Sequence, residues 1–175
     1  SVAKAITPLR AKSDKTKAFV AGRRALWTQL KGISQNKKVV WMHCASLGEY
    51  EQGLPVLTAL KNNHPEHFYL VTFFSPSGYQ VRKNQGVANL VSYLPWDTKA
   101  DVKRFIAMVN PIMALLVKYE FWPNLIRELH RKEVPMYLIA GLFRQNQHFF
   151  KPWGISQRKL PVSYTHLTLP TISCV

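Results

Sequence analysis

Residues 39–61 read VVWMHCASLGEYEQGLPVLTALK, a short apolar run followed by a segment with helical spacing. The run at 39–43 predicts a buried strand, because it is almost wholly apolar. Three leucines spaced three residues apart predict a helix over Gly48–Lys61 with one buried face. A buried strand that leads into an amphipathic helix is half of a βαβ unit, from which parallel sheets are built.

The same alternation continues to residue 140. Further strands are expected at Phe68–Phe73, Leu90–Leu94, Ile112–Val117 and Pro135–Ala140, and helices at Pro76–Asn84, Thr98–Val109 and Pro123–Arg131. The pattern predicts an α/β fold, a Rossmann-like doubly wound parallel sheet covered by helices on both faces. If the strand order is 3-2-1-4-5, the loops after strands one and four meet where the order reverses, which is where such sheets bind ligands.

Positive charge is concentrated near the N-terminus. The chain of 175 residues carries 24 Lys and Arg against 9 Asp and Glu, a formal net charge of +15. Residues 1–40 hold ten basic side chains and one acidic one, a net charge of +9. Apolar residues at helical spacing over Thr16–Lys31 predict an amphipathic basic helix that stops at Gly32. The excess predicts an anionic partner: nucleic acid, anionic lipid or a phosphorylated substrate.

The length suits one ordinary domain, and the chain divides into three parts. Residues 1–37 are expected to form a basic segment and helix, and residues 38–160 the Rossmann-like domain. Residues 161–175 contain PVSYTHLTLPT, which is similar to the translation of a sequencing adapter. This stretch is therefore interpreted as a non-native tail and left out of the fold, with a natural polar arm as the alternative. On that interpretation the natural protein continues beyond about Leu160.

Several common motifs are absent from the sequence. There is no Gly-x-Gly for a dinucleotide, no Gly-x-x-x-x-Gly-Lys phosphate loop and no Gly-x-Ser-x-Gly nucleophile turn. Cys44 and Cys174 are the only cysteines, which excludes a disulfide framework and a zinc-finger spacing. His64 and His67 flank a proline in a polar loop, so no metal site is expected there. His43 is interpreted as a packing residue, with a catalytic role as the alternative.

Two acidic residues follow the two strands that flank the expected reversal point. Ser46 and Glu49 fit a capping box, in which Ser46 accepts from the amide three residues on and Glu49 reaches back to the Ser46 amide. The functional alternative is that Glu49 takes a proton from a substrate hydroxyl, while Gly48 lets the substrate approach the backbone. The two interpretations are compatible only if the Glu49 side chain is free. Glu120 either belongs to a capped helix start beside a buried Trp122, or faces Glu49 as a second carboxylate.

Two further loops are candidate anion sites. Ser75, Ser77 and Gly78 follow the second strand, and their backbone amides are candidate donors to an anion. Arg144 follows the fifth strand and suits a phosphate or carboxylate, with a solvated arginine as the alternative.

Six segments, taken in order, carry a family resemblance: VAGRR at 20–24, HCASLGE at 43–49, SPSG at 75–78, PWD at 95–97, EFWPN at 120–124 and GLFR at 141–144. The set resembles the N-terminal domain of the 3-deoxy-D-manno-octulosonic acid (Kdo) transferases of lipopolysaccharide synthesis, over about residues 17 to 154. The resemblance implies a GT-B glycosyltransferase, in which two Rossmann-like domains face each other across a cleft. The N-terminal domain then holds the lipid acceptor, and a C-terminal domain holds the CMP-sugar.

The resemblance also implies a reaction, the metal-independent transfer of Kdo from CMP-Kdo to a lipid A precursor (lipid IVA), with inversion and without a cofactor. Glu49 falls on the family's general base and Glu120 on a second carboxylate credited with transition-state stabilisation. The substrate-binding candidates are then Ser46, Gly48, Ser75, Ser77, Gly78, Trp122, Asn124 and Arg144.

The same resemblance implies a place for the protein, the cytoplasmic face of the bacterial inner membrane. The basic segment would lie against the anionic membrane surface. The family's N-terminal anchor and CMP-binding domain are not found in these 175 residues, so the chain alone is expected to be inactive. The enzyme alternative is another GT-B glycosyltransferase with a different acceptor. A nucleic-acid-binding module is disfavoured, because most aromatic residues fall inside expected strands or on helix faces.

Overall fold

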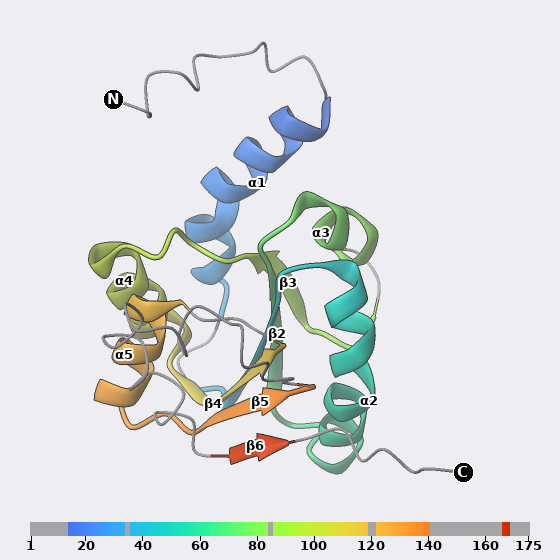
Figure 1. The fold of residues 1–175 in the computed structure, drawn as a ribbon, viewed down its shortest axis with the longest axis vertical. Coiled ribbons are helices and arrows are strands. Elements are labelled where there is room, and N and C mark those ends of the chain that lie inside the picture. The colour runs from blue at the N-terminus through green and yellow to red at the C-terminus, as the bar shows by residue number, and fades with distance from the viewer. Residues whose placement is uncertain (1–13, 34–35, 84–85, 119–121, 141–165, 169–175) are drawn as a thin grey trace, which may run out of the picture.

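The computed structural model describes residues 14–33, 36–83, 86–118, 122–140 and 166–168 (Figure 1). The helices are α1 (Asp14–Leu30), α2 (Leu47–Asn63), α3 (Pro76–Arg82), α4 (Lys99–Val109) and α5 (Pro123–Arg131). The strands are β1 (Val39–Cys44), β2 (Phe68–Phe73), β3 (Leu90–Tyr93), β4 (Pro111–Val117), β5 (Met136–Ile139) and β6 (His166–Thr168). Up to residue 140, every element expected from the sequence is present, with ends that differ by at most two residues.

The strands form one sheet of order β3-β2-β1-β4-β5-β6, in which every neighbouring pair is parallel. The first five strands have the predicted order, and the predicted Rossmann-like α/β fold is confirmed. Strand β6 is an addition, because it lies within residues 161–175, which the sequence interpretation leaves out of the fold. Among the described residues, β5 would be the edge strand without it. Threonine in particular is a residue type that pairs readily on such an edge.

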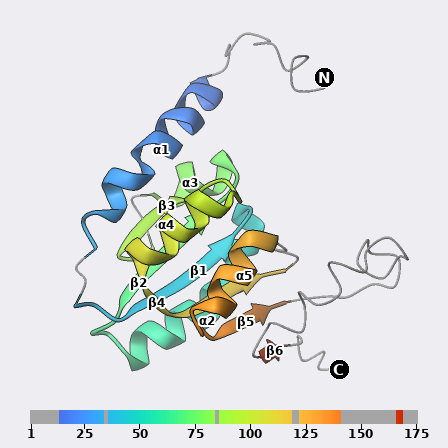
Figure 2. The same cartoon turned by 90° about the vertical axis from the view of Figure 1, so that its left-hand side faces the viewer.

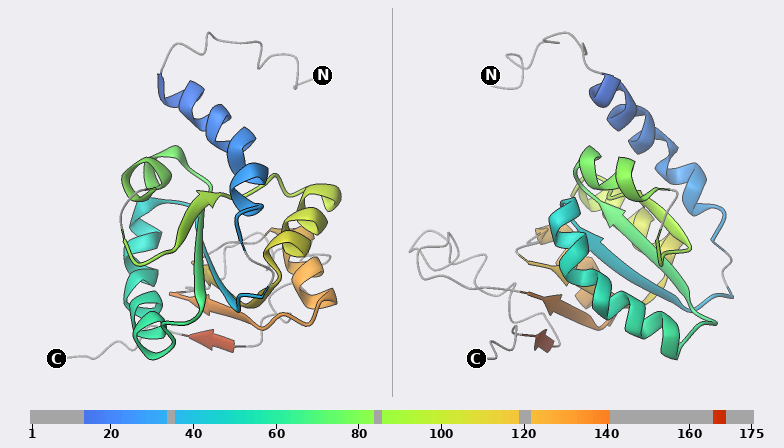
Figure 3. Two further views of the ribbon diagram at one scale, coloured as in Figure 1. Left: turned by 180° about the vertical axis from the view of Figure 1, so that it is seen from behind. Right: turned by 90° about the vertical axis from the view of Figure 1, so that its right-hand side faces the viewer.

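Helices cover both faces of the sheet, and each face has its own core. Leucines and other apolar residues of α1, α4 and α5 pack with one set of strand side chains, and α2 and α3 pack with the other set. Figure 2 shows α4 and α5 in front of the sheet, and the right-hand view of Figure 3 shows α2 and α3 in front of the opposite face. This layering explains why β1 is buried along its whole length.

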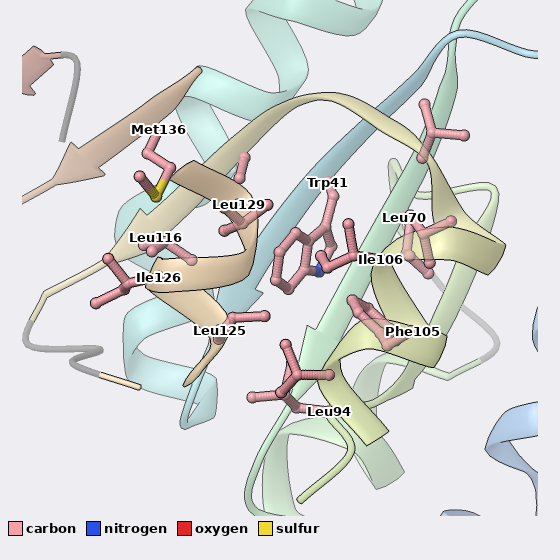
Figure 4. Close-up of a cluster of buried hydrophobic side chains, with 14 of the residues drawn as sticks. Trp41, Leu70, Leu94, Phe105, Ile106, Leu116, Leu125, Ile126, Leu129 and Met136 are labelled. Atoms are coloured by element: carbon pink, nitrogen blue, oxygen red, sulfur yellow. The ribbon is translucent and has the colours of Figure 1, made fainter. Parts of the chain in front are cut away.

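Successive side chains of β1 enter the two cores alternately. Trp41 joins the core beneath α4, where its ring meets Phe105 edge-on with centroids 5.1 Å apart (Figure 4). Met42 joins the opposite core, beneath α2. A Cβ added to Gly53 of α2 would lie 2.7 Å from the Met42 sulfur and 3.0 Å from Val117 Cγ2. Glycine at this position therefore lets α2 approach the centre of the sheet closely.

Helix α1 packs on the sheet through its C-terminal half. Leu26 and Leu30 are buried in the core, and a Cβ on Gly22 would meet the Tyr93 ring at 2.3 Å. The predicted basic helix is therefore held against β3, with Arg24 exposed to solvent. Among the described residues, no helix combines the length and apolar character needed to cross a membrane.

Candidate functional site

The loops that follow the strands meet at the carboxyl edge of the sheet, as parallel pairing requires. The loops after β1 and β2 are joined directly, because the Ser75 amide donates to the Ala45 carbonyl at 2.8 Å. The loop after β3 is joined to β2 by the Leu94 amide, which donates to the Phe73 carbonyl at 2.9 Å. The point where the strand order reverses lies between β1 and β4. The predicted site residues of the described loops are therefore neighbours.

Glu49 lies in the first turn of α2, directly after β1. Its amide donates to Ser46 Oγ at 3.4 Å, and its own Oε2 accepts from the Ala45 amide at 2.6 Å. The expected capping box is therefore present, with one difference: the carboxylate reaches the Ala45 amide, one residue before the expected donor. An amide donor and a helix N-terminus both stabilise a carboxylate anion. The cap thus fixes a half-buried carboxylate beside the reversal point.

Gly48 leaves open space next to this carboxylate. It is exposed, and a Cβ added to it would meet no atom within 4 Å. Packing therefore does not require glycine here, and its predicted role of letting a ligand approach the backbone stays a prediction. The Ser46 side chain serves as the N-cap acceptor of α2.

The loop after β2 has a clear structural role. Ser75 is the N-cap residue of α3, and Ser77 lies in the first turn of this seven-residue helix. Gly78 is buried, and an added Cβ would lie 2.2 Å from Cδ1 of Phe73. The need for glycine at position 78 is therefore explained by packing of α3 on β2, and anion binding by this loop stays a prediction.

A stack of rings with one cation joins α1 to the carboxyl edge. We call Arg23, Phe74, Trp96 and Trp122 the arginine–aromatic stack. The Arg23 guanidinium carbon lies 4.0 Å from the Trp96 ring centroid and 4.5 Å from that of Phe74. Phe74 in turn lies 4.9 Å from Trp122, between ring centroids. The stack therefore connects α1 with the loops after β2, β3 and β4.

Burial of the guanidinium lowers the pKa of Arg23 from its ordinary value, while the nearby Tyr93 acts in the opposite direction. A hollow of about 470 Å³ lies beside the stack, lined by Val20, Arg23, Arg24, Leu26, Trp27, Pro95, Trp96 and Asp101. The sequence did not single out Arg23 or Phe74 as site residues. The sequence signal for the stack was limited to Arg23 and Trp96, which lie in motifs that carry the family resemblance.

His43 is fully buried at the end of β1. Its Nδ1 lies 2.9 Å from Thr72 Oγ1. Trp41 Nε1 donates to the same hydroxyl oxygen at 2.9 Å. The ring of His43 meets the Trp122 ring edge-on at 6.1 Å between centroids. The structure therefore gives His43 the packing and hydrogen-bonding role that the sequence favoured.

Asp97 and Asn124 form a second connection, between the loops after β3 and β4. The Asp97 carboxylate caps α5, because Oδ1 accepts from the Leu125 amide at 2.9 Å and Oδ2 from the Asn124 amide at 3.1 Å. The Asn124 side-chain nitrogen donates to the Asp97 carbonyl at 2.6 Å. Asn124, predicted to bind substrate, thus holds the loops together. Asp97 was missed as a cap because its partners lie 27 and 28 residues away.

Glu120 and Arg144, the other predicted site residues, lie outside the residues that the structure describes. The pairing of Glu120 with Glu49 across the site therefore stays a prediction. Trp122, two residues later, is half-buried and contributes its ring to the arginine–aromatic stack.

The sheet order and the helix layers define a Rossmann-like α/β domain. A crystal structure from Listeria monocytogenes, described as a UDP-N-acetylglucosamine 2-epimerase, has a similar fold with a TM-score of 0.51 and 16% identity. The match covers 79% of this chain and 40% of that chain. This likeness shows the fold alone.

The family follows from the sequence of the same domain. The family model of 3-deoxy-D-manno-octulosonic-acid transferase (kdotransferase) matches residues 20–155, and the chain belongs to this family. The 3-deoxy-D-manno-octulosonic acid transferase of Aquifex aeolicus is 38% identical over 91 residues, which cover 51% of this chain and 25% of the relative. The 3-deoxy-D-manno-octulosonic acid transferase of Haemophilus influenzae is 32% identical over 103 residues, which cover 58% of this chain and 24% of the relative. The chain thus spans about a quarter of the curated relatives it matches.

Proposed function

We propose that the chain is the acceptor-binding domain of a glycosyltransferase that moves Kdo from CMP-Kdo to a lipid A precursor, with inversion at the anomeric carbon. Family membership and the names of the relatives support Kdo as the transferred sugar. The observation that carries the proposal is the position of Glu49, in the first turn of α2 beside the reversal point. The base role requires that the carboxylate leave the Ala45 amide when the acceptor binds. A general base must be deprotonated and placed beside the hydroxyl from which it takes the proton.

In the proposed reaction, Glu49 takes the proton of the acceptor hydroxyl. The hydroxyl oxygen then forms a bond to the anomeric carbon of Kdo, while the bond from that carbon to the CMP phosphate oxygen breaks. CMP leaves with the electron pair of that bond as a phosphate anion. Glu120 is proposed as a second carboxylate that stabilises the positive charge developing at the anomeric centre. No metal or cofactor takes part in this scheme.

The donor and the membrane are further parts of the proposal. CMP-Kdo would bind mainly to a second domain, which faces this one in a GT-B arrangement. The basic residues within positions 1–17, together with Arg24, would lie against the anionic cytoplasmic face of the inner membrane. Arg24 is exposed on α1 and is suitably placed for such a contact.

The test uses a chimera, in which residues 20–155 replace the matching segment of the Aquifex aeolicus relative. The chimera is expected to incorporate labelled Kdo into lipid IVA. Glu49→Gln should reduce this rate by roughly 10²- to 10⁴-fold, the usual contribution of a general base. The matched control is Glu51→Gln on the same helix, because Glu51 is exposed and contacts Arg82. The control should retain the rate of the chimera.

Near-normal turnover of the Glu49→Gln chimera would refute the assignment of the base. A chimera that folds, as judged by circular dichroism, but transfers only to another acceptor would favour a glycosyltransferase of different specificity. The 175-residue chain by itself is expected to give no transfer. Incorporation of labelled Kdo by that chain alone would contradict the requirement for a second domain.

A further inference from the structure

Three side chains with metal-binding groups converge in the turn between α2 and β2. His64, Glu66 and His67 each offer one ligand atom, and these atoms lie within 4.8 Å of one another. Glu66 Oε1 is 3.7 Å from His64 Nδ1 and 3.3 Å from His67 Nε2. The turn precedes β2, so it lies at the amino edge of the sheet, opposite the edge that carries Glu49.

The separations are close to those of a tetrahedral metal site. Bond lengths of 2.0–2.2 Å to nitrogen and oxygen place neighbouring donors of a tetrahedral zinc ion about 3.3 Å apart. The pair formed by Glu66 and His67 already has this separation. The His67 side chain is only 12% exposed, so one imidazole is held in place.

His64 must move to complete the site. Its ring stacks on that of His67, with centroids 5.1 Å apart and planes inclined by 20°. Two stacked rings do not aim their nitrogens at one ion. The His64 side chain is 53% exposed, however, so rotation of its ring toward Glu66 meets little obstruction.

The backbone of the turn is fixed independently of any ligand. The His64 amide donates to the Leu60 carbonyl at 2.8 Å, and the His67 amide donates to the His64 carbonyl at 3.2 Å. The hydroxyl of buried Tyr69 lies 2.7 Å from the Leu60 carbonyl oxygen and 3.0 Å from that of His64. The three ligand-bearing residues are therefore presented by a pre-formed turn, which lowers the entropy lost on binding.

We propose, against the expectation from the sequence, that His64, Glu66 and His67 bind a divalent transition-metal ion such as Zn²⁺, with the remaining position taken by water. Two imidazoles and one carboxylate suit zinc, cobalt or nickel, whereas magnesium and calcium prefer oxygen ligands alone. The ion would tie the C-terminal end of α2 to the start of β2. The ion takes no part in the proposed transfer reaction. The proposal of a metal site therefore does not depend on the proposed function.

The proposal is tested by calorimetric titration of the full 175-residue chain with zinc chloride. One equivalent should bind, and magnesium chloride should give no heat of binding. The cobalt form should show the visible absorption of tetrahedral Co²⁺. His64→Ala, Glu66→Gln and His67→Ala should each weaken zinc binding by roughly 10-fold or more, because loss of a direct ligand costs at least as much as loss of a group that only hydrogen-bonds a ligand.

His130→Ala is the matched control, because His130 is an exposed histidine of α5 outside the cluster. It should bind zinc as the parent chain does. Glu66→Gln separates loss of the ligand from loss of the fold. The Glu66 side chain is 64% exposed, so this substitution should leave the circular dichroism spectrum unchanged. Absence of binding to the parent chain, or binding that persists in all three cluster variants, would overturn the proposal.

Discussion

Arg23→Ala should destabilise the chain by about 2 kcal/mol, because the guanidinium is held between two aromatic rings. The guanidinium carbon lies 4.0 Å from the Trp96 centroid and 4.5 Å from the Phe74 centroid. A cation–π contact contributes about 0.5–1 kcal/mol when exposed and about 2 kcal/mol when desolvated, so two half-buried contacts give about 1 kcal/mol each. The hydrogen bond from Arg23 Nη2 to the Phe74 carbonyl, at 3.4 Å, is long and adds little.

The assay is equilibrium unfolding of the 175-residue chain in urea, followed by far-ultraviolet circular dichroism. Arg24→Ala is the matched control, because it removes the same charge from an exposed position on the same turn of α1. Its cost should stay within about 0.5 kcal/mol, as is usual for surface substitutions. Arg23→Lys should recover only part of the loss, because a compact ammonium group lacks the planar, delocalised surface that a guanidinium offers to an aromatic ring.

A local measurement separates loss of the stack from a general loss of stability. Trp96 is 54% exposed in the intact protein, and removal of Arg23 should expose it further to an aqueous quencher of tryptophan fluorescence. Equal costs for Arg23→Ala and Arg24→Ala, together with unchanged quenching, would refute the view that the stack connects α1 to the carboxyl edge of the sheet.

Three further predictions concern stability. Gly78→Ala should lower the urea midpoint at a cost of about 1–3 kcal/mol, because the new Cβ would lie 2.2 Å from the Phe73 ring; Gly48→Ala, which meets nothing within 4 Å, should be neutral or slightly stabilising. Asp97→Ala should cost about 1 kcal/mol through loss of the α5 cap, measured as a lower melting temperature; an unchanged melting temperature would contradict that role. Burial raises the pKa of Tyr93 to about 12. An unfolded tyrosine loses its proton near pH 10, so stability should fall between about pH 10 and pH 12, by at most roughly 3 kcal/mol. Tyr93→Phe should remove this fall in stability between about pH 10 and pH 12. The same pH dependence in the variant and the parent chain would contradict the role of Tyr93.

Much of the fold could be predicted because its signals are local. The apolar run of β1 and the leucine spacing of α2 lie within residues 39–61, and each reflects the period of one element. The alternation of elements then limits the topology, since crossovers between parallel strands are almost always right-handed. The position of Glu49 after β1 was predictable for the same reason, and so was the capping box around it.

Other features depend on residues that are far apart along the chain. The sequence predicted the Ser46 amide as donor to the Glu49 carboxylate, but the donor is the Ala45 amide. The course of the backbone before α2 decides which amide the carboxylate reaches. Strand β6 pairs with β5 because an open edge accepts a short β-prone segment, irrespective of its position in the chain.

The sequence by itself determined the class of fold, the order of the first five strands and the loops that carry the predicted site. These follow from periodicity and from the few chain paths that parallel sheets allow. Only the tertiary structure decided which residues of those loops support one another. Arg23 contacts Phe74, which is 51 residues further along the chain, and Asp97 contacts Asn124, which is 27 residues further along. Phe74, Asp97 and Asn124 are brought together because the parallel strands end at one edge of the sheet. Contacts of that kind leave no periodic signal, since they depend on where whole elements come to lie.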